Sequence, residues 1–171
     1  MKTVLVLRHA KAEGDSPSGS DFDRPLTDRG RQESAAVGRA LRNRRVEAIL
    51  ASPAARVVET VEGIMEKSSL DFAPAWDRRL YNAPPEALLE AIRETGDAVG
   101  TLLVVAHNPG LQELIVDLAQ DDRAGLREQV GGSFPTAALA ELNLSIDRWE
   151  DAGPGCGQIL SLVRPRDLDR E

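Results

Sequence analysis

Several features are scarce or missing in this chain of 171 residues, and each shortage excludes a class of protein. A single cysteine, Cys156, cannot form an internal disulfide framework, so we expect a reducing, cytoplasmic setting. No apolar run approaches the roughly 20 residues of a membrane-spanning helix, and no secretory signal is recognisable around the first apolar segment, residues 4–7. The formal net charge of −7 argues against nucleic-acid binding, which needs a basic surface. We therefore expect a protein that binds neither membranes nor nucleic acids.

The rest of the composition is that of an ordinary globular protein, with 42% hydrophobic and 29% charged residues. The chain is long enough for one sizeable core, and no repeat or Pro/Gly/Ser-rich linker divides it. We predict one domain over residues 1–164, followed by a charged, frayed tail at 165–171.

Short apolar runs alternate along the chain with segments of helical periodicity. Strands are expected at 3–7, 46–51, 72–76 and 101–106, and helices from Thr27, from Ser52-Pro53, at 85–95 and from Asn108-Pro109. Two further strands, 137–146 and 157–163, follow without a helix between them. This order predicts a three-layer α/β/α sandwich with a mostly parallel central sheet and an antiparallel edge.

The two histidines of the chain each follow a predicted buried strand directly. His9 follows the first strand and His107 follows the strand at 101–106. If both strands belong to one parallel sheet, both imidazoles emerge at the rim where such sheets bind ligands. Either histidine alone would be explained as a strand-end residue with surface hydrogen bonds, but the pair indicates a site.

Two predicted helix starts face the same rim. Ser52-Pro53 and Asn108-Pro109 each combine a favourable N-cap residue with proline at the first helical position. Ordinary capping would explain either pair alone. Because the N–H groups and positive dipole end of a helix attract anions, the two together indicate an anion site.

Two arginines support this interpretation. Arg8 ends a run of buried aliphatic residues, where a charge is costly unless it finds a partner. Arg56 lies one turn into the helix expected from Ser52, and the planar fork of an arginine fits phosphoryl oxygens. The long polar segment 10–26 offers Lys11 and Arg24 as further positive groups, with solvated loop charges as the alternative.

Four motifs in order together resemble the histidine phosphatase superfamily, and within it the small SixA-type phosphohistidine phosphatases. They are Leu7-Arg8-His9-Ala10, Arg24-Pro25-Leu26-Thr27-Asp28-Arg29-Gly30, Ser52-Pro53-Ala54-Ala55-Arg56 through Thr60, and Val105-Ala106-His107-Asn108-Pro109. The matching motifs span residues 4 to about 118, and four motifs in register are far more specific than the Arg-His pair alone.

The resemblance implies a role for each matching residue. His9 would be the nucleophile that forms a phosphohistidine intermediate, and Arg8, Arg56 and His107 would hold the phosphoryl oxygens. Arg24 would contact the phosphate from the long loop. Asn108 and Lys11 are further candidates for phosphate binding, and we expect no metal ion or other cofactor, because the sequence has no recognisable metal-binding motif.

Three positions depart from the pattern of that superfamily. Ala10 stands where many relatives have glycine, and Glu59 where glutamine is frequent; both changes are mild. Tyr81 occupies the neighbourhood in which other branches carry a proton-donating glutamate. An alkoxide leaving group needs such an acid, whereas a protonated phosphoimidazole departs as neutral imidazole, so the absence favours phosphohistidine as the substrate.

Two alternatives stay open at this point. One is a phosphatase for small phosphomonoesters, in which a loop acid supplies the proton; the candidates are Glu13, Asp15, Asp21 and Asp23. The other is a non-catalytic module that binds phosphate or a phosphoprotein, which the presence of His9 disfavours. We expect the partner to be a phosphorylated signalling or phosphorelay protein, or else a small phosphate ester, and the chain to act as a monomer. Residues 121–135 could wall the pocket but have no assigned role.

Overall fold

The computed structural model describes residues 1–168, so the last three residues of the tail expected at 165–171 lie outside the described residues. Its centre is a six-stranded sheet with the order β3-β2-β4-β1-β5-β6. The strands are β1 (Lys2–Arg8), β2 (Ala48–Ala51), β3 (Ala75–Trp76), β4 (Thr101–Ala106), β5 (Leu139–Leu144) and β6 (Gly157–Val163). Neighbours among β1 to β4 are parallel, whereas β5 runs antiparallel to β1, and β6 to β5. The predicted mostly parallel sheet with an antiparallel edge is confirmed.

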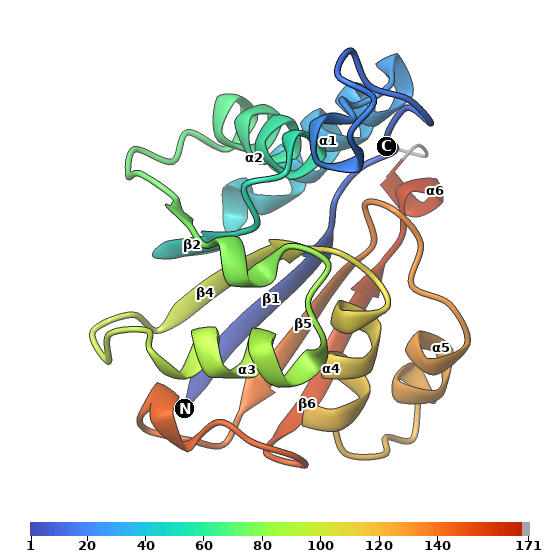
Figure 1. Cartoon of the computed structure of the whole chain (residues 1–171). Helices are drawn as coiled ribbons and strands as arrows, with labels where there is room; N and C mark the ends of the chain where they lie inside the picture. Colours follow the sequence, from blue (N-terminus) through green and yellow to red (C-terminus); the bar gives the residue numbers. More distant parts are fainter. Residues whose placement is uncertain (169–171) are drawn as a thin grey trace.

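Helices cover both faces of the sheet (Figure 1). On one face lie α1 (Asp28–Ala40) and α2 (Ala55–Ser68), and on the other α3 (Pro85–Arg93) and α4 (Gly110–Leu118). The shorter elements are α5 (Leu126–Gly132), α6 (Pro165–Leu168), and the 3₁₀ turns η1 (Asp21–Asp23), η2 (Leu41–Asn43), η3 (Arg78–Leu80) and η4 (Trp149–Asp151). The architecture is thus the expected three-layer sandwich.

The central strand β1 shows how the sequence builds these layers. Val4 and Val6 pack into the apolar cluster under α3 and α4, whereas Leu5 and Leu7 pack into the cluster under α1 and α2. Each such side chain, when fully buried, contributes about 1.5–3 kcal/mol. Because a one-residue slip would move every side chain to the opposite face, this packing fixes the register of β1. It also fixes where Arg8 and the following residue leave the sheet.

Helix α1 begins as predicted. Thr27 is its N-cap, and its hydroxyl accepts a hydrogen bond from the backbone N–H of Gly30 at 2.9 Å. A Cβ atom on Gly30 would lie 2.1 Å from the carbonyl oxygen of Lys11. Glycine is therefore needed where the first turn of α1 touches the start of the long loop.

Several boundaries differ from the sequence prediction. β2 begins two residues later than expected, β5 is shorter than expected at both ends, and β3 has only two residues. Both predicted helix starts were wrong: α2 begins at Ala55, after Ser52-Pro53, and α4 begins at Gly110, with Pro109 at its N-cap position. The reason is that the side chains of Ser52 and Asn108 bind other partners at the rim, as described below.

Two short helices were not predicted. Helix α5 lies in the stretch 121–135, where three glycines and several polar residues obscure the apolar periodicity of a helix. Helix α6 occupies the tail that we expected to be frayed; Leu168 packs against the apolar cluster on the α1 and α2 side of the sheet. Within residues 1–168, no helix combines the length and apolar character that crossing a membrane requires.

Candidate active site

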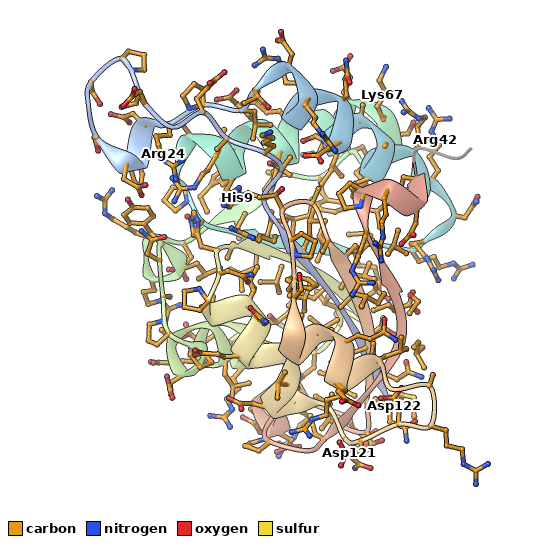
Figure 2. All side chains as sticks on the ribbon, turned by 90° about the vertical axis from the view of Figure 1, so that its right-hand side faces the viewer. His9, Arg24, Arg42, Lys67, Asp121 and Asp122 are labelled. Carbon is orange, nitrogen blue, oxygen red and sulfur yellow. The ribbon has the colours of Figure 1, made fainter. Side chains whose placement is uncertain are left out.

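The two histidines leave neighbouring strands at the same level. Arg8 is paired with Ala106 in the parallel register of β1 and β4, so His9 and His107 follow matched positions. Their ring centroids are 5.4 Å apart. Figure 2 shows His9 at the end of its strand, between the two helical layers. The sheet therefore brings together the two side chains that the sequence placed on one rim.

His9 is held in one orientation. It is only 6% exposed, and its Nδ1 donates to the carbonyl oxygen of Ala10 at 2.8 Å, because a carbonyl can only accept. The proton is therefore on Nδ1, which leaves Nε2 with its lone pair. Burial lowers the pKa of His9 to about 4; the Ala10 carbonyl bond opposes the shift, and the charges of Arg56, Arg8 and Arg24 add to it. His9 is thus a neutral imidazole at pH 7.

His107 is also buried and neutral. Its Nε2 lies 2.8 Å from the hydroxyl of Ser52, and that hydroxyl accepts a bond from the N–H of Ala54 at 3.3 Å. This leaves the Ser52 proton free to be donated to Nε2, which would put the imidazole proton on Nδ1. Burial first, and then the charge of Arg56, lowers the pKa of His107 to about 3. Ser52 therefore orients His107 and does not cap α2.

Arg56 lies in the first turn of α2 and is only 3% exposed. Its two terminal nitrogens bind Asp21: Nη1 donates to the backbone carbonyl at 2.8 Å and Nη2 to Oδ2 at 3.2 Å. On the other side of the rim, Nη1 of Arg8 donates to the carbonyl of Phe134 at 3.3 Å. Burial, together with the charge of Arg56, lowers the pKa of Arg8. An acidic chain has thus gathered two arginines beside two neutral histidines.

Three buried nitrogens at this rim have no hydrogen-bond partner among residues 1–168: Nε of Arg8, Nε of Arg56 and Nδ1 of His107. A buried polar group without a partner costs about 1–3 kcal/mol, and more when it is charged. The oxygens of a bound phosphoryl group would satisfy such donors. The arrangement is therefore chemically suited to an oxyanion.

Asp21 is the residue that sequence reasoning undervalued, because it stood only among four possible loop acids. Its Oδ2 accepts hydrogen bonds from Arg56, from the Tyr81 hydroxyl at 2.5 Å and from Asn82 at 3.5 Å. Its Oδ1 accepts from Nε of Arg24 at 3.0 Å. The Tyr81 bond first, and then the neighbouring arginines, hold the pKa of Asp21 well below its usual range. The carboxylate is therefore ionised.

The remaining predicted residues are placed differently. Arg24 joins the site through Asp21, and its Nη1 also donates to the carbonyl of Glu13 at 2.7 Å. Lys11 is exposed, and the contacts described for it come from its backbone. Asn108 uses its amide on the chain, donating to the Phe134 carbonyl at 2.7 Å and accepting from the Gln112 N–H at 3.2 Å. Asn108 thus holds the segment that also binds Arg8.

The two ends of the stretch 121–135 lie in different parts of the molecule, and one of them reaches the rim. Asp121 and Asp122 lie at the end of the molecule away from His9 (Figure 2). Phe134 reaches the rim and offers its carbonyl to Arg8 and Asn108. Within residues 1–168, no three His, Cys, Asp or Glu side chains are grouped so that they could hold a metal ion.

Comparison with known proteins places this geometry in a family. The model of the histidine phosphatase superfamily (branch 1) matches residues 4–80. The uncharacterized protein Rv1276c of Mycobacterium tuberculosis is 36% identical over 165 residues, which cover 94% of this chain and all of that protein. Phosphohistidine phosphatase SixA of Escherichia coli is 28% identical over 151 residues, covering 82% of this chain and 84% of SixA.

A solved structure of the protein histidine phosphatase SixA, complexed with tungstate, has the same fold. The TM-score is 0.79 at 24% sequence identity, and the match covers 97% of this chain and 99% of the other. The resemblance noted from the four motifs is thus confirmed at the level of the family. The chain belongs to the histidine phosphatase superfamily, branch 1.

Proposed function

We propose that this histidine phosphatase removes phosphate from phosphohistidine on another protein, with His9 as the nucleophile. The observation that carries the proposal is the state of His9: neutral, oriented by Ala10, and with Nε2 left to attack. A neutral imidazole needs no metal ion to act as a nucleophile once its tautomer is fixed.

The donors around His9 support phosphoryl transfer in particular. Charge in its transition state spreads over three equatorial oxygens, so positioning and electrostatic stabilisation carry most of the catalysis. Arg8, Arg56 and His107 would each direct a buried nitrogen at those oxygens. Nε2 of His9 attacks phosphorus, the bond to the leaving group breaks, and water then hydrolyses the phosphorylated His9.

The substrate class follows from proton supply. The carboxyl group that binds Arg56 and Arg24, that of Asp21, is ionised and has no proton to give to an alkoxide. A protonated phosphoimidazole needs no such donor. The similarity to SixA of E. coli, a phosphohistidine phosphatase, favours the same class. The proposed partner is a signalling or phosphorelay protein in the cytoplasm, and the enzyme acts as a monomer without a cofactor.

The test is to incubate the purified protein with a phosphohistidine-bearing protein and to follow phosphate release. An acid-labile, alkali-stable phosphate should accumulate on His9 and be located by mass spectrometry, and His9→Ala should release nothing. EDTA should leave the rate unchanged.

Three results would contradict the proposal. Turnover of phosphomonoesters alone would favour the small-molecule phosphatase. A loss of activity in EDTA that added metal restores would indicate a metal-dependent hydrolase. Binding of the phosphoprotein with no hydrolysis, unchanged in His9→Ala, would favour a non-catalytic module.

A further inference from the structure

We propose that the Asp21 carboxylate determines specificity, by accepting a hydrogen bond from the leaving imidazole of the substrate and keeping it protonated. This inference rests on the proposed function and concerns the same site. It assigns a task to the carboxylate that pairs with the buried guanidinium of Arg56.

Asp21 is held by donors from three separate segments. Arg24 belongs to its own loop, Arg56 to α2, and Tyr81 and Asn82 to the turn after η3. The backbone of Asp21 is held as well, because Arg56 donates to its carbonyl at 2.8 Å. A side chain on an exposed loop would otherwise be free to point into solvent. Here its position is set from several directions, which is what a group that recognises a ligand needs.

The position of Asp21 is on the open side of the site. Tyr81, which donates to Asp21, has its ring edge-on to His107 with centroids 5.5 Å apart, and His107 in turn lies beside His9. His9 is buried at the strand end, whereas the Asp21 side chain is 48% exposed. In-line displacement puts the leaving group opposite the nucleophile, and therefore toward solvent. That is the side from which the Asp21 carboxylate reaches the site.

The carboxylate has room for one more donor. Oδ1 accepts a single bond, from Arg24, and a carboxylate oxygen offers two acceptor positions. The ring nitrogen of phosphohistidine that does not carry phosphorus is the natural donor once it is protonated. A carboxylate beside it favours the charged imidazolium form. An alkoxide leaving group gains nothing from the same carboxylate, because it needs a proton and meets a negative charge.

The step is balanced in atoms and charge. The lone pair of His9 Nε2 forms the new bond to phosphorus, and the electron pair of the old nitrogen–phosphorus bond returns to the substrate ring. That ring keeps the proton on its other nitrogen, facing Asp21, and leaves as neutral imidazole. His9 keeps its Nδ1 proton toward Ala10 and carries the phosphoryl group as an imidazolium until water removes it.

The experiment compares Asp21→Asn with Asp23→Asn, a matched change in the same η1 turn; the Asp23 carboxylate accepts a bond from Ser18 on the loop. The value of kcat/KM is measured against pH with two substrates: a phosphohistidine protein, and p-nitrophenyl phosphate, whose leaving phenolate needs no proton.

For Asp21→Asn we expect kcat/KM on phosphohistidine to fall by about 10–100-fold. We also expect the alkaline limb of the pH profile of this variant to move about one pH unit lower, because the substrate imidazole must then take its proton from solution. Turnover of p-nitrophenyl phosphate should stay the same or rise, and Asp23→Asn should match the unaltered protein on both substrates.

A second variant, Tyr81→Phe, removes one donor and keeps the carboxylate. It should lower phosphohistidine turnover less than Asp21→Asn does and should leave the alkaline limb in place. An equal loss on both substrates in Asp21→Asn, without a shifted limb, would mean that Asp21 only positions Arg56. A gain on both substrates would mean that it competes with the phosphoryl group. Either result overturns the inference alone, whereas failure of the unaltered protein to hydrolyse phosphohistidine overturns the proposed function and the inference with it.

Discussion

The buried pocket at the strand ends, which is formed by His9, His107 and Arg56, differs from the long loop of residues 10–26. The two contribute to the same site in different ways. His9, His107 and Arg56 are 6%, 2% and 3% exposed, and they come from the ends of β1 and β4 and the first turn of α2. The Asp21 side chain is 48% exposed, and side-chain donors from other segments hold it in place. The sheet and α2 therefore fix the proposed chemistry, while the loop supplies the group proposed to select the substrate.

The largest effect is expected at the end of β1. His9→Ala removes the proposed nucleophile, and no other neutral imidazole with a free Nε2 is described at the rim. We expect kcat to fall by at least about 10⁴-fold, as when a nucleophile is removed from other enzymes. Phosphate release from a phosphohistidine protein measures the loss. Retention of more than a few per cent of the rate would mean that the pocket holds another nucleophile.

Arg56 joins the pocket to the loop, so its removal should affect both. In Arg56→Gln we expect a loss of about 10²–10³ in kcat, or roughly 2.7–4 kcal/mol, the usual cost of one transition-state donor. Because Asp21 loses the donors that hold both its backbone carbonyl and its carboxylate, residues 10–26 should also become easier to cleave in limited proteolysis.

The matched control for this change is Arg42→Gln. Figure 2 places Arg42 well away from His9, and it is exposed on η2. It should change activity and cleavage little, as surface substitutions generally do. A large loss of activity in Arg56→Gln without faster cleavage would separate the two roles and show that the loop is held without Arg56.

A smaller effect concerns the pH dependence of stability. Burial is the main reason why the folded-state pKa of His107 is lowered to about 3. The unfolded chain therefore binds a proton on this histidine below about pH 6.5, whereas the folded chain binds it only near pH 3. The contribution of neutral His107 to the free energy of unfolding is therefore fully present above pH 6.5, and it is lost as the pH falls toward the folded-state pKa. At pH 5, this histidine should cost about 2 kcal/mol of the free energy of unfolding.

Urea unfolding at pH 7.5 and pH 5 tests this prediction. His107→Gln should lose about 2 kcal/mol less than the unaltered protein between the two pH values. The same pH dependence in both proteins would mean that His107 titrates normally in the folded state, and that the pocket is wetter than its burial indicates.

The same division describes what the sequence could predict. The strands before His9 and His107 are continuous apolar runs covered on both faces, so their pattern alone placed both histidines on one rim. Arg8 followed because it ends the buried run before His9, and Arg56 because it lies one turn into the helix expected from Ser52. These residues are positioned by periodicity, which a sequence contains directly.

The loop could not be predicted in the same way. Asp21 meets Arg56 and Tyr81 across 35 and 60 residues of sequence, and these contacts follow no period. Ser52 and Asn108 looked like N-caps, but each found a tertiary partner instead. One signal was available: Asp21 lies three residues before Arg24 of the recognised motif, at a spacing that allows the ion pair that forms.

The smallest expected effect concerns the far end of the loop. Thr27 caps α1 through Gly30, and its hydroxyl also donates to the Lys11 carbonyl at 3.2 Å, so it ties the two ends of residues 11–27 together. Thr27→Ala should cost about 1 kcal/mol in the free energy of unfolding, the usual cost of a lost cap. The value of kcat/KM for phosphohistidine should change by less than about threefold, because Asp21 keeps its own donors from Arg24, Arg56 and Tyr81. Thermal or urea unfolding and the phosphohistidine assay on one preparation measure both. If Thr27→Ala instead lowered kcat/KM as far as Asp21→Asn, the loop would depend on its ends for position, and the cluster of donors around Asp21 would not be what fixes the carboxylate.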